Sequence, residues 1–117
     1  MKKYNKIVLT GASGRLGSYL REPLSKITKK LVSTDKEDIG KTLHNEVFKK
    51  LNIKNLKEVN KILKKTDLII HFGGYSNEGP FQEILDSNIL GTYNIWKSAK
   101  KNKIKRIIFA SSIHSVG

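Results

Sequence analysis

The sequence predicts an α/β domain built on a doubly wound parallel sheet. Short runs of apolar, often β-branched residues alternate along the chain with longer stretches in which apolar residues recur at helical spacing. A glycine cluster directly follows the first apolar run, and the order strand, glycine turn, helix is typical of such sheets. At 117 residues the chain is expected to form one domain, residues 1–117, with its own core.

The first strand is predicted at residues 7–9, and the glycine turn that follows it is the most informative stretch. Gly11, Gly14 and Gly17 have the spacing G-x-x-G-x-x-G. The first glycine suits a sharp turn off the strand, the second a close approach of backbone to a pyrophosphate, and the third close packing of the next helix. Because the N-terminus of that helix then faces the anion, a nucleotide site is favoured over a purely structural turn.

A second strand is predicted over residues 30–34, and it ends in an acid. Asp35 lies eighteen residues after Gly17, close to where a carboxylate accepts hydrogen bonds from an adenosine ribose. The helix before this strand contains Pro23, which lacks a backbone donor and is expected to bend or reorganise the helix.

Three further strands are expected. Residues 46–53 form a weaker, charged strand suited to a sheet edge. Residues 68–72 form a buried strand that runs into Gly73 and Gly74, and residues 107–112 form a strand whose end is polar. The prediction is therefore a Rossmann-type sheet truncated after about the fifth strand, with ligands at the carboxyl ends of its strands.

Two helices connect these later strands. Residues 56–63 carry an apolar stripe opposite lysine and glutamate, which is the pattern of an amphipathic crossover helix. A long helix is expected to begin at Pro80 and to end near Lys101.

Composition limits the classes of function. The chain has no cysteine, which excludes a disulfide framework and cysteine-ligated metal, and no metal site is predicted. The formal net charge of +13 comes mostly from scattered lysine pairs without interleaved aromatic residues, so solvated faces are favoured over nucleic-acid binding. No stretch has the length of a membrane span or signal sequence, and we expect a cytoplasmic protein.

With these motifs placed, the whole chain resembles the N-terminal part of the extended short-chain dehydrogenase/reductases, the NAD-dependent epimerase/dehydratase group, and within it the uronate dehydrogenases. Four blocks carry the resemblance: Thr10-Gly11-Ala12-Ser13-Gly14-Arg15-Leu16-Gly17, His71-Phe72-Gly73-Gly74-Tyr75-Ser76, Asn88-Ile89-Leu90-Gly91-Thr92-Tyr93-Asn94 and Phe109-Ala110-Ser111-Ser112-Ile113-His114. The first and third blocks are typical of the superfamily, whereas the second and fourth indicate uronate dehydrogenase.

The resemblance implies a cofactor and its contacts. Asp35 would hold the ribose hydroxyls and disfavour a 2′-phosphate, so NAD is preferred over NADP. Asn52, where the family usually has aspartate, and Ile53 would lie at the adenine. Asn88 would either contact the cofactor or tie the helix to a loop. The remaining implied cofactor-binding residues line the turn and the ends of two later strands: Gly11, Ser13, Gly14, Arg15, Leu16, Gly17, Phe72, Gly73, Gly74 and Ser111.

The resemblance also implies a substrate site. Ser112 would be a catalytic serine bonded to the reacting substrate oxygen, and Ser76 and His114 would help to hold a sugar acid. The alternatives are a strand-end turn for the serine and a surface loop for the histidine. Ile113 stands where uronate dehydrogenases usually carry asparagine.

The catalytic tyrosine and lysine of this superfamily lie downstream of the serine, and no such pair follows Ser112 in these residues. Tyr93 and Lys97 have the Tyr-x-x-x-Lys spacing but precede the serine, so they are interpreted as neighbours on a helix face. We therefore expect the NAD-binding part of an enzyme that oxidises a sugar acid, inactive by itself and able to form a homo-oligomer. A nucleotide-sugar epimerase or dehydratase, or a non-catalytic dinucleotide-binding module, are the alternatives.

Overall fold

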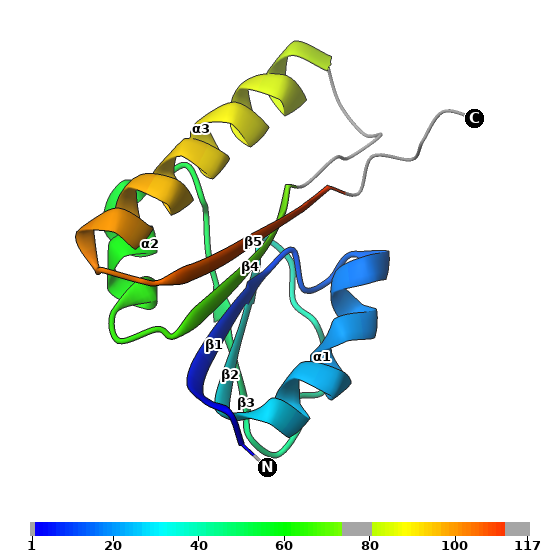
Figure 1. Ribbon diagram of the computed structural model, residues 1–117. Helices are drawn as coiled ribbons and strands as arrows, with labels where there is room; N and C mark the ends of the chain where they lie inside the picture. The colour runs from blue at the N-terminus through cyan, green and yellow to red at the C-terminus, as the bar shows by residue number, and fades with distance from the viewer. Residues whose placement is uncertain (1, 74–80, 112–117) are drawn as a thin grey trace.

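The computed structural model describes residues 2–73 and 81–111, with side chains placed for residues 2–72 and 89–109. The elements follow in the order β1 (Tyr4–Thr10), α1 (Arg15–Ile27), β2 (Thr28–Asp35), β3 (Glu46–Lys50), α2 (Leu56–Leu63), β4 (Leu68–Gly73), α3 (Phe81–Lys101) and β5 (Arg106–Ser111). All strand pairs are parallel, and the sheet order is β3-β2-β1-β4-β5 (Figure 1). The predicted Rossmann-type α/β fold is confirmed.

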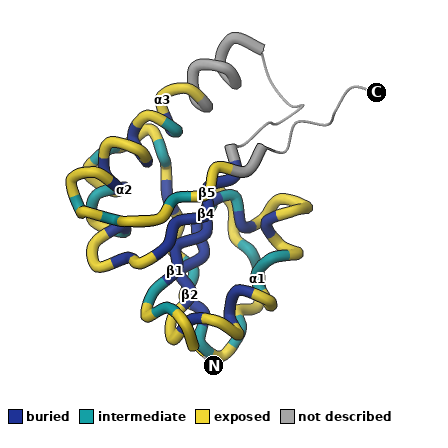
Figure 2. Tube along the Cα trace, viewed as in Figure 1, coloured by how far each residue is buried: buried dark blue, intermediate teal, exposed yellow. Residues whose placement is uncertain are grey.

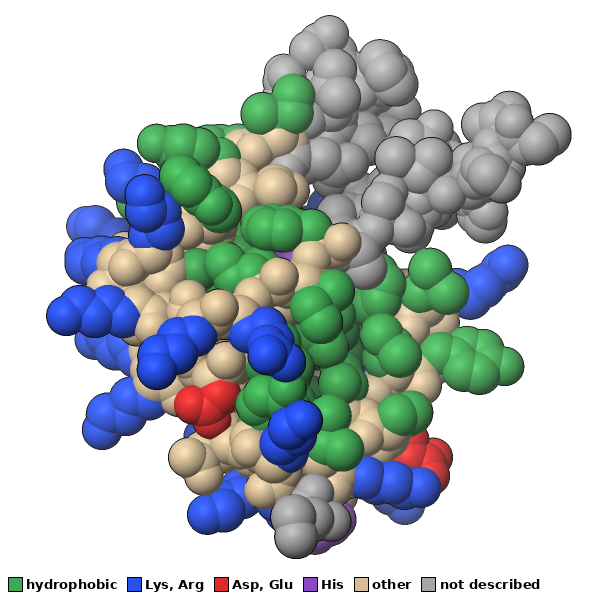
Figure 3. Space-filling view, viewed as in Figure 1, with side chains coloured by type: hydrophobic (Ala, Val, Ile, Leu, Met, Phe, Trp, Pro, Cys, Tyr) green, Lys and Arg blue, Asp and Glu red, His purple; other side chains and the backbone are tan. Residues whose placement is uncertain are grey.

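Helices cover the two faces of the sheet, α1 on one face and α2 with α3 on the other (Figure 1). Because successive strand residues point to opposite faces, β1 sends Ile7 and Leu9 toward α1 and Val8 toward α2 and α3. The three central strands, β2, β1 and β4, are accordingly buried along most of their length (Figure 2). Lysine and arginine side chains project from the surface around them (Figure 3).

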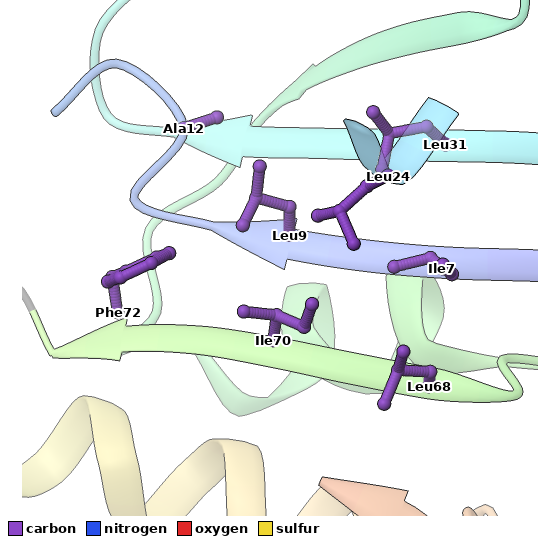
Figure 4. Close-up of a cluster of buried hydrophobic side chains, with 8 residues drawn as sticks. All are labelled: Ile7, Leu9, Ala12, Leu24, Leu31, Leu68, Ile70 and Phe72. Carbon is purple, nitrogen blue, oxygen red and sulfur yellow. The ribbon is translucent and has the colours of Figure 1, made fainter. Parts of the chain in front are cut away.

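The buried core on the α1 face comes from the three central strands, from Ala12 of the turn and from Leu24 of the helix, and Leu20 of the helix packs against it (Figure 4). Leu24 of α1 lies over Ile7, Leu9 and Leu31, and Phe72 closes the cluster beside Ala12. The second cluster joins Val8 and Ile69 of the sheet to Val59 and Leu63 of α2 and to Ile95 of α3. The first core thus extends to the carboxyl ends of β1 and β4, where Leu9, Ala12 and Phe72 lie.

The helix α1 continues through Pro23 to Ile27, so the expected reorganisation does not interrupt it. Carbonyl groups near the proline accept hydrogen bonds from side chains. Ser25 donates to the Glu22 carbonyl at 2.6 Å, and Lys2 and Asn45 donate to the Ser25 carbonyl. These bonds satisfy the last turn of the helix.

β3 lies at the sheet edge as predicted, but it ends at Lys50 rather than at residue 53. Leu51 makes one more backbone bond to β2, and a turn follows in which Asn55 N–H donates to the Asn52 carbonyl at 2.9 Å. The Asn52 side chain also accepts from Lys54 N–H, and such local bonds compete with a strand.

Candidate functional site

The glycine turn lies at the carboxyl end of β1, between β2 and β4. Gly11 has φ +70°, a conformation in which side-chain-bearing residues are strained. A Cβ there would lie 3.0 Å from Cβ of Phe72, so the turn also passes directly over β4. Strand order reverses at this point, since the chain leaves β1 toward β2 on one side and returns to β4 on the other. Open α/β sheets bind ligands at such switch points.

Close packing requires the third glycine. A Cβ on Gly17 would lie 2.0 Å from the Gly11 carbonyl oxygen, which is far inside any real contact. The first turn of α1 therefore rests directly on the loop that precedes it. This matches the packing role predicted for Gly17.

The N-terminus of α1 has the features of an anion site. Its N-cap, Gly14, has extended backbone and provides no side-chain cap, and the first turn of α1 contains no acidic residue. The residues that open the helix, Arg15 and Leu16, are exposed. Exposed N–H groups at a positive helix end favour a negatively charged group such as phosphate.

Asp35 is held against the turn. Its Oδ2 accepts hydrogen bonds from Ser13 N–H at 2.9 Å and from Ser13 Oγ–H at 2.6 Å, while its Oδ1 accepts from Lys36 N–H at 2.7 Å. The structure thus brings together the two features that the sequence placed far apart, the glycine turn and the acid that ends β2. The carboxylate is half-buried and fixed in place before any ligand binds.

Ile53 lies where the turn after β3 meets α3. Its carbonyl accepts a hydrogen bond from Asn94 Nδ2 at 2.9 Å, and the helix passes it at Gly91, where a Cβ would clash with the Ile53 side chain. Asn52 beside it is exposed. The backbone after β3 is therefore fixed to α3, and the amide oxygen of the exposed Asn52 accepts from Lys54 N–H within the turn.

Sequence reasoning gave no role to His71, which lies on β4 beneath the turn. Its Nδ1 is 2.5 Å from Thr10 Oγ1 of β1, and its Nε2 is 3.1 Å from Thr92 Oγ1 of α3. The Phe109 ring of β5 packs edge-on against the imidazole, with the ring centroids 5.9 Å apart. Burial lowers the pKa of His71 to about 4. The neutral ring donates with one nitrogen and accepts with the other, and so links three elements next to Gly11.

A buried ion pair on the α1 side was also missed. Arg21 of α1 donates to both carboxylate oxygens of Glu46, whose side chain is fully buried, and Ser33 of β2 donates to the same carboxylate. Burial alone would raise the pKa of Glu46, but the hydrogen bonds from Arg21, Ser33 and the Leu43 N–H lower it. Ser33 and Asp35 lie two residues apart on β2 and so share one face of the sheet, but this spacing does not identify Arg21 and Glu46 as partners.

The remaining expected residues lie at the ends of β4, α3 and β5. Gly73 and Ser111 pair in register as the last residues of β4 and β5, and Asn88 lies in α3, but the side chains of the last two are outside the described set. Gly74, Ser76, Ser112 and His114 fall outside the described residues altogether.

The described residues offer neither a metal site nor a membrane span. They contain no group of three or more histidine, aspartate or glutamate side chains placed to hold a metal ion. None of the helices in residues 2–73 and 81–111 combines the length and the apolarity needed to cross a membrane.

Comparison with known proteins agrees with this geometry. Uronate dehydrogenase from Pseudomonas syringae pv. tomato is 39% identical over 116 residues, a match that covers 97% of this chain and 42% of that protein. Uronate dehydrogenase from Agrobacterium fabrum is 36% identical, with 96% and 42% covered. The chain therefore spans about two fifths of the length of these relatives.

Solved structures give the same result. A mutant uronate dehydrogenase from Agrobacterium tumefaciens complexed with NAD superposes with a TM-score of 0.85 at 35% identity, covering 97% of this chain and 43% of that one. The sequence model of one protein family, described as "NAD dependent epimerase/dehydratase family", matches residues 7–117 of this chain. Because this match includes nearly the whole sequence, the chain belongs to the NAD dependent epimerase/dehydratase family.

Proposed function

We propose that this chain binds NAD through the glycine turn and Asp35, and that it is the NAD-binding part of an oxidoreductase similar to uronate dehydrogenase. One observation carries the proposal: Ser13 donates two hydrogen bonds to the carboxylate of Asp35 and directly precedes Gly14, the N-cap of α1. The helix N-terminus, which has no side-chain cap, and the fixed carboxylate are therefore neighbours. The first suits a pyrophosphate and the second a ribose diol.

The residues present fit this cofactor. Gly11 and Gly14 carry no side chain that would block the approach of a phosphate to the turn, and the carboxylate of Asp35, which is hydrogen-bonded to Ser13 of the same turn, offers acceptor oxygens beside it. A carboxylate at this place repels a 2′-phosphate, which favours NAD over NADP. When bound, NAD would accept a hydride from the substrate, and this chain's described residues would hold and orient it.

The substrate class follows from the relatives. Relatives that are 36% and 39% identical to this chain are named uronate dehydrogenases, so the proposed substrate of the whole enzyme is a sugar acid. Ser76, Ser112 and His114 remain the residues proposed to contact it. By themselves, residues 1–117 are expected to bind NAD without turnover, because no Tyr-x-x-x-Lys pair follows the serine.

Calorimetric titration of NAD into the 117-residue chain tests the proposal. Asp35→Ala should weaken binding by about tenfold or more, because hydrogen bonds to a charged acceptor are lost. Glu37→Ala is the matched control, since Glu37 is exposed two residues away and its loss changes the net charge equally. Circular dichroism checks that both variants fold.

Three results would contradict the proposal. They are no heat of binding at millimolar NAD, equal affinity in Asp35→Ala and the parent chain, or tighter binding of NADP than of NAD. NADH formation from NAD and glucuronate by the 117 residues would instead show that they are active, and would return Tyr93 and Lys97 to consideration.

A further inference from the structure

Ser13 of the glycine turn and Asp35 at the end of β2 form a hydrogen-bonded pair of side chains. Ser13 Oγ–H donates to Asp35 Oδ2 at 2.6 Å, and the backbone N–H of the same serine donates to the same oxygen at 2.9 Å. Ser13 is exposed and Asp35 is half-buried. The serine hydroxyl therefore lies at the surface, in contact with the carboxylate that is proposed to bind the ribose.

The carboxylate of Asp35 has few acceptor positions left for a ligand. A carboxylate has about four lone-pair positions, two on each oxygen. Ser13 uses both positions of Oδ2, and Lys36 N–H uses one position of Oδ1 at 2.7 Å. One acceptor position, on Oδ1, is therefore open to a ligand.

A ribose presents two neighbouring hydroxyl donors, so it needs a second acceptor, and the Ser13 oxygen supplies one. A hydroxyl oxygen has two lone pairs besides its proton, and the proton of Ser13 is directed to Asp35. Within residues 2–72 and 89–109 no other group donates to this oxygen. Its bond to a charged acceptor also polarises the hydroxyl, which strengthens the oxygen as an acceptor.

We propose that Ser13 and Asp35 bind the adenosine ribose together, with one hydroxyl of the sugar donating to Asp35 Oδ1 and the other to Ser13 Oγ. This proposal rests on the proposed function, because it requires NAD to occupy the glycine turn. It assigns to Ser13 a contact with the sugar rather than with the pyrophosphate. None of the hydrogen bonds within the pair has to break on binding, so the two acceptors are already in place for the ligand.

Calorimetric titration with NAD and with two analogues tests this contact. One analogue lacks the 2′-hydroxyl of the adenosine ribose and the other lacks its 3′-hydroxyl, and each is titrated into the parent 117-residue chain and into Ser13→Ala. Alanine removes the hydroxyl and keeps the backbone N–H that donates to Asp35. The parent chain should bind each analogue about fivefold more weakly than NAD, because one hydrogen bond is lost.

Ser13→Ala should bind NAD about fivefold more weakly than the parent chain does. For one analogue the two chains should have equal affinity, because the hydroxyl that contacts Ser13 is already absent. For the other analogue a difference of about fivefold should remain, since that hydroxyl contacts Asp35.

Two variants serve as controls. Ser13→Thr keeps a hydroxyl and should bind NAD within about twofold of the parent affinity. Ser18→Ala makes the same chemical change at an exposed serine of α1, whose hydroxyl donates to the Arg15 carbonyl, and it should leave all three affinities unchanged.

Four results would overturn the proposal. Ser13→Ala could bind NAD as tightly as the parent chain, or more tightly, in which case the hydroxyl competes with the ribose for Asp35. The parent chain could bind both analogues as tightly as NAD. Finally, Ser13→Ala could lose the same affinity for NAD and for both analogues, which would place the hydroxyl on a phosphate.

Failure of the proposed function gives a different result. The parent chain then does not bind NAD, or Asp35→Ala binds NAD as tightly as the parent chain does, and both proposals are wrong. If NAD binds and Asp35→Ala weakens it, the analogue titrations decide the role of Ser13 alone.

Discussion

At the scale of single residues, His71 shows how a buried polar group can support a binding turn without touching the ligand. Its two nitrogens bond to hydroxyls of Thr10 and Thr92, so a side chain of β4 holds the residue before Gly11 and a residue of α3 together. Such a network stabilises only while every member is satisfied. A second proton on the imidazole would turn its acceptor nitrogen into a donor and charge a buried site.

This predicts a loss of stability at mildly acidic pH. Because the pKa of His71 falls from 6.5 to about 4 on folding, protonation favours the unfolded chain. The stabilisation is complete above pH 6.5 and declines as the pH falls toward 4. Between pH 7.5 and pH 5 the free energy of unfolding should fall by about 2 kcal/mol, measured by urea denaturation.

The variant His71→Gln should be less stable than the parent chain at pH 7.5 but should lose far less stability on acidification. His44→Gln, at an exposed position, should keep the parent's pH dependence. Glu46 does not confuse the comparison, because its pKa lies below its usual 4.5 and its pairing is still present at pH 5. Identical pH profiles for His71→Gln and the parent chain would rule out this account.

At the scale of elements, the pattern of apolar and charged residues correctly predicted which segments form strands and which form helices. The apolar runs that became β1, β2, β4 and β5 and the stripe of α2 were correctly typed, and the charged residues of β3 correctly indicated an edge. The boundary of β3 was wrong because Asn52 closes a turn on its neighbours. The Arg21–Glu46 pair and the His71 links could not be predicted, because their partners come from elements far apart in the chain.

The contact between α1 and its preceding turn gives an element-scale prediction. Gly17→Ala should destabilise the chain by about 2 kcal/mol, because its Cβ would meet the Gly11 carbonyl oxygen at 2.0 Å and both segments must move apart. NAD affinity should fall with it, since the turn and the helix N-terminus form one site. Urea denaturation and calorimetry measure the two effects.

Gly14→Ala separates binding from folding. A Cβ at Gly14 would meet only the Gly11 carbonyl oxygen, at an ordinary contact distance of 3.4 Å, so stability should change by no more than about 0.5–1 kcal/mol. Its NAD affinity should nevertheless drop, because the methyl group occupies the space through which the pyrophosphate approaches backbone. Equal NAD affinity in Gly14→Ala and the parent chain would show that the phosphates lie elsewhere.

At the scale of the whole molecule, the two sheet edges differ in kind. β3 exposes Lys49 and Lys50, whereas β5 exposes Ile108 and Phe109 beside α3. A charged edge discourages strand pairing, and exposed apolar side chains form a surface that another protein element can cover. The composition suggested solvated lysine faces everywhere, and only the placement of α3 beside β5 reveals that some of these lysines border an apolar surface.

The net charge of +13 makes a last prediction about the molecule as a whole. Like charges repel more strongly in the compact state than in the unfolded chain, and salt screens this repulsion. Raising sodium chloride from about 20 to 200 mM should therefore raise the free energy of unfolding by about 1 kcal/mol. Urea denaturation at fixed pH measures it.

Lys29→Gln/Lys30→Gln tests the cause of this effect. The two lysines are exposed, and the charge of Lys30 contributes, after burial, to the lowered pKa of Lys6. Their removal should stabilise the chain at low salt, and the gain should shrink as salt is added. If salt instead destabilised the parent chain, favourable pairs such as Arg21–Glu46 would outweigh the lysine repulsion, and this account of the net charge would be wrong.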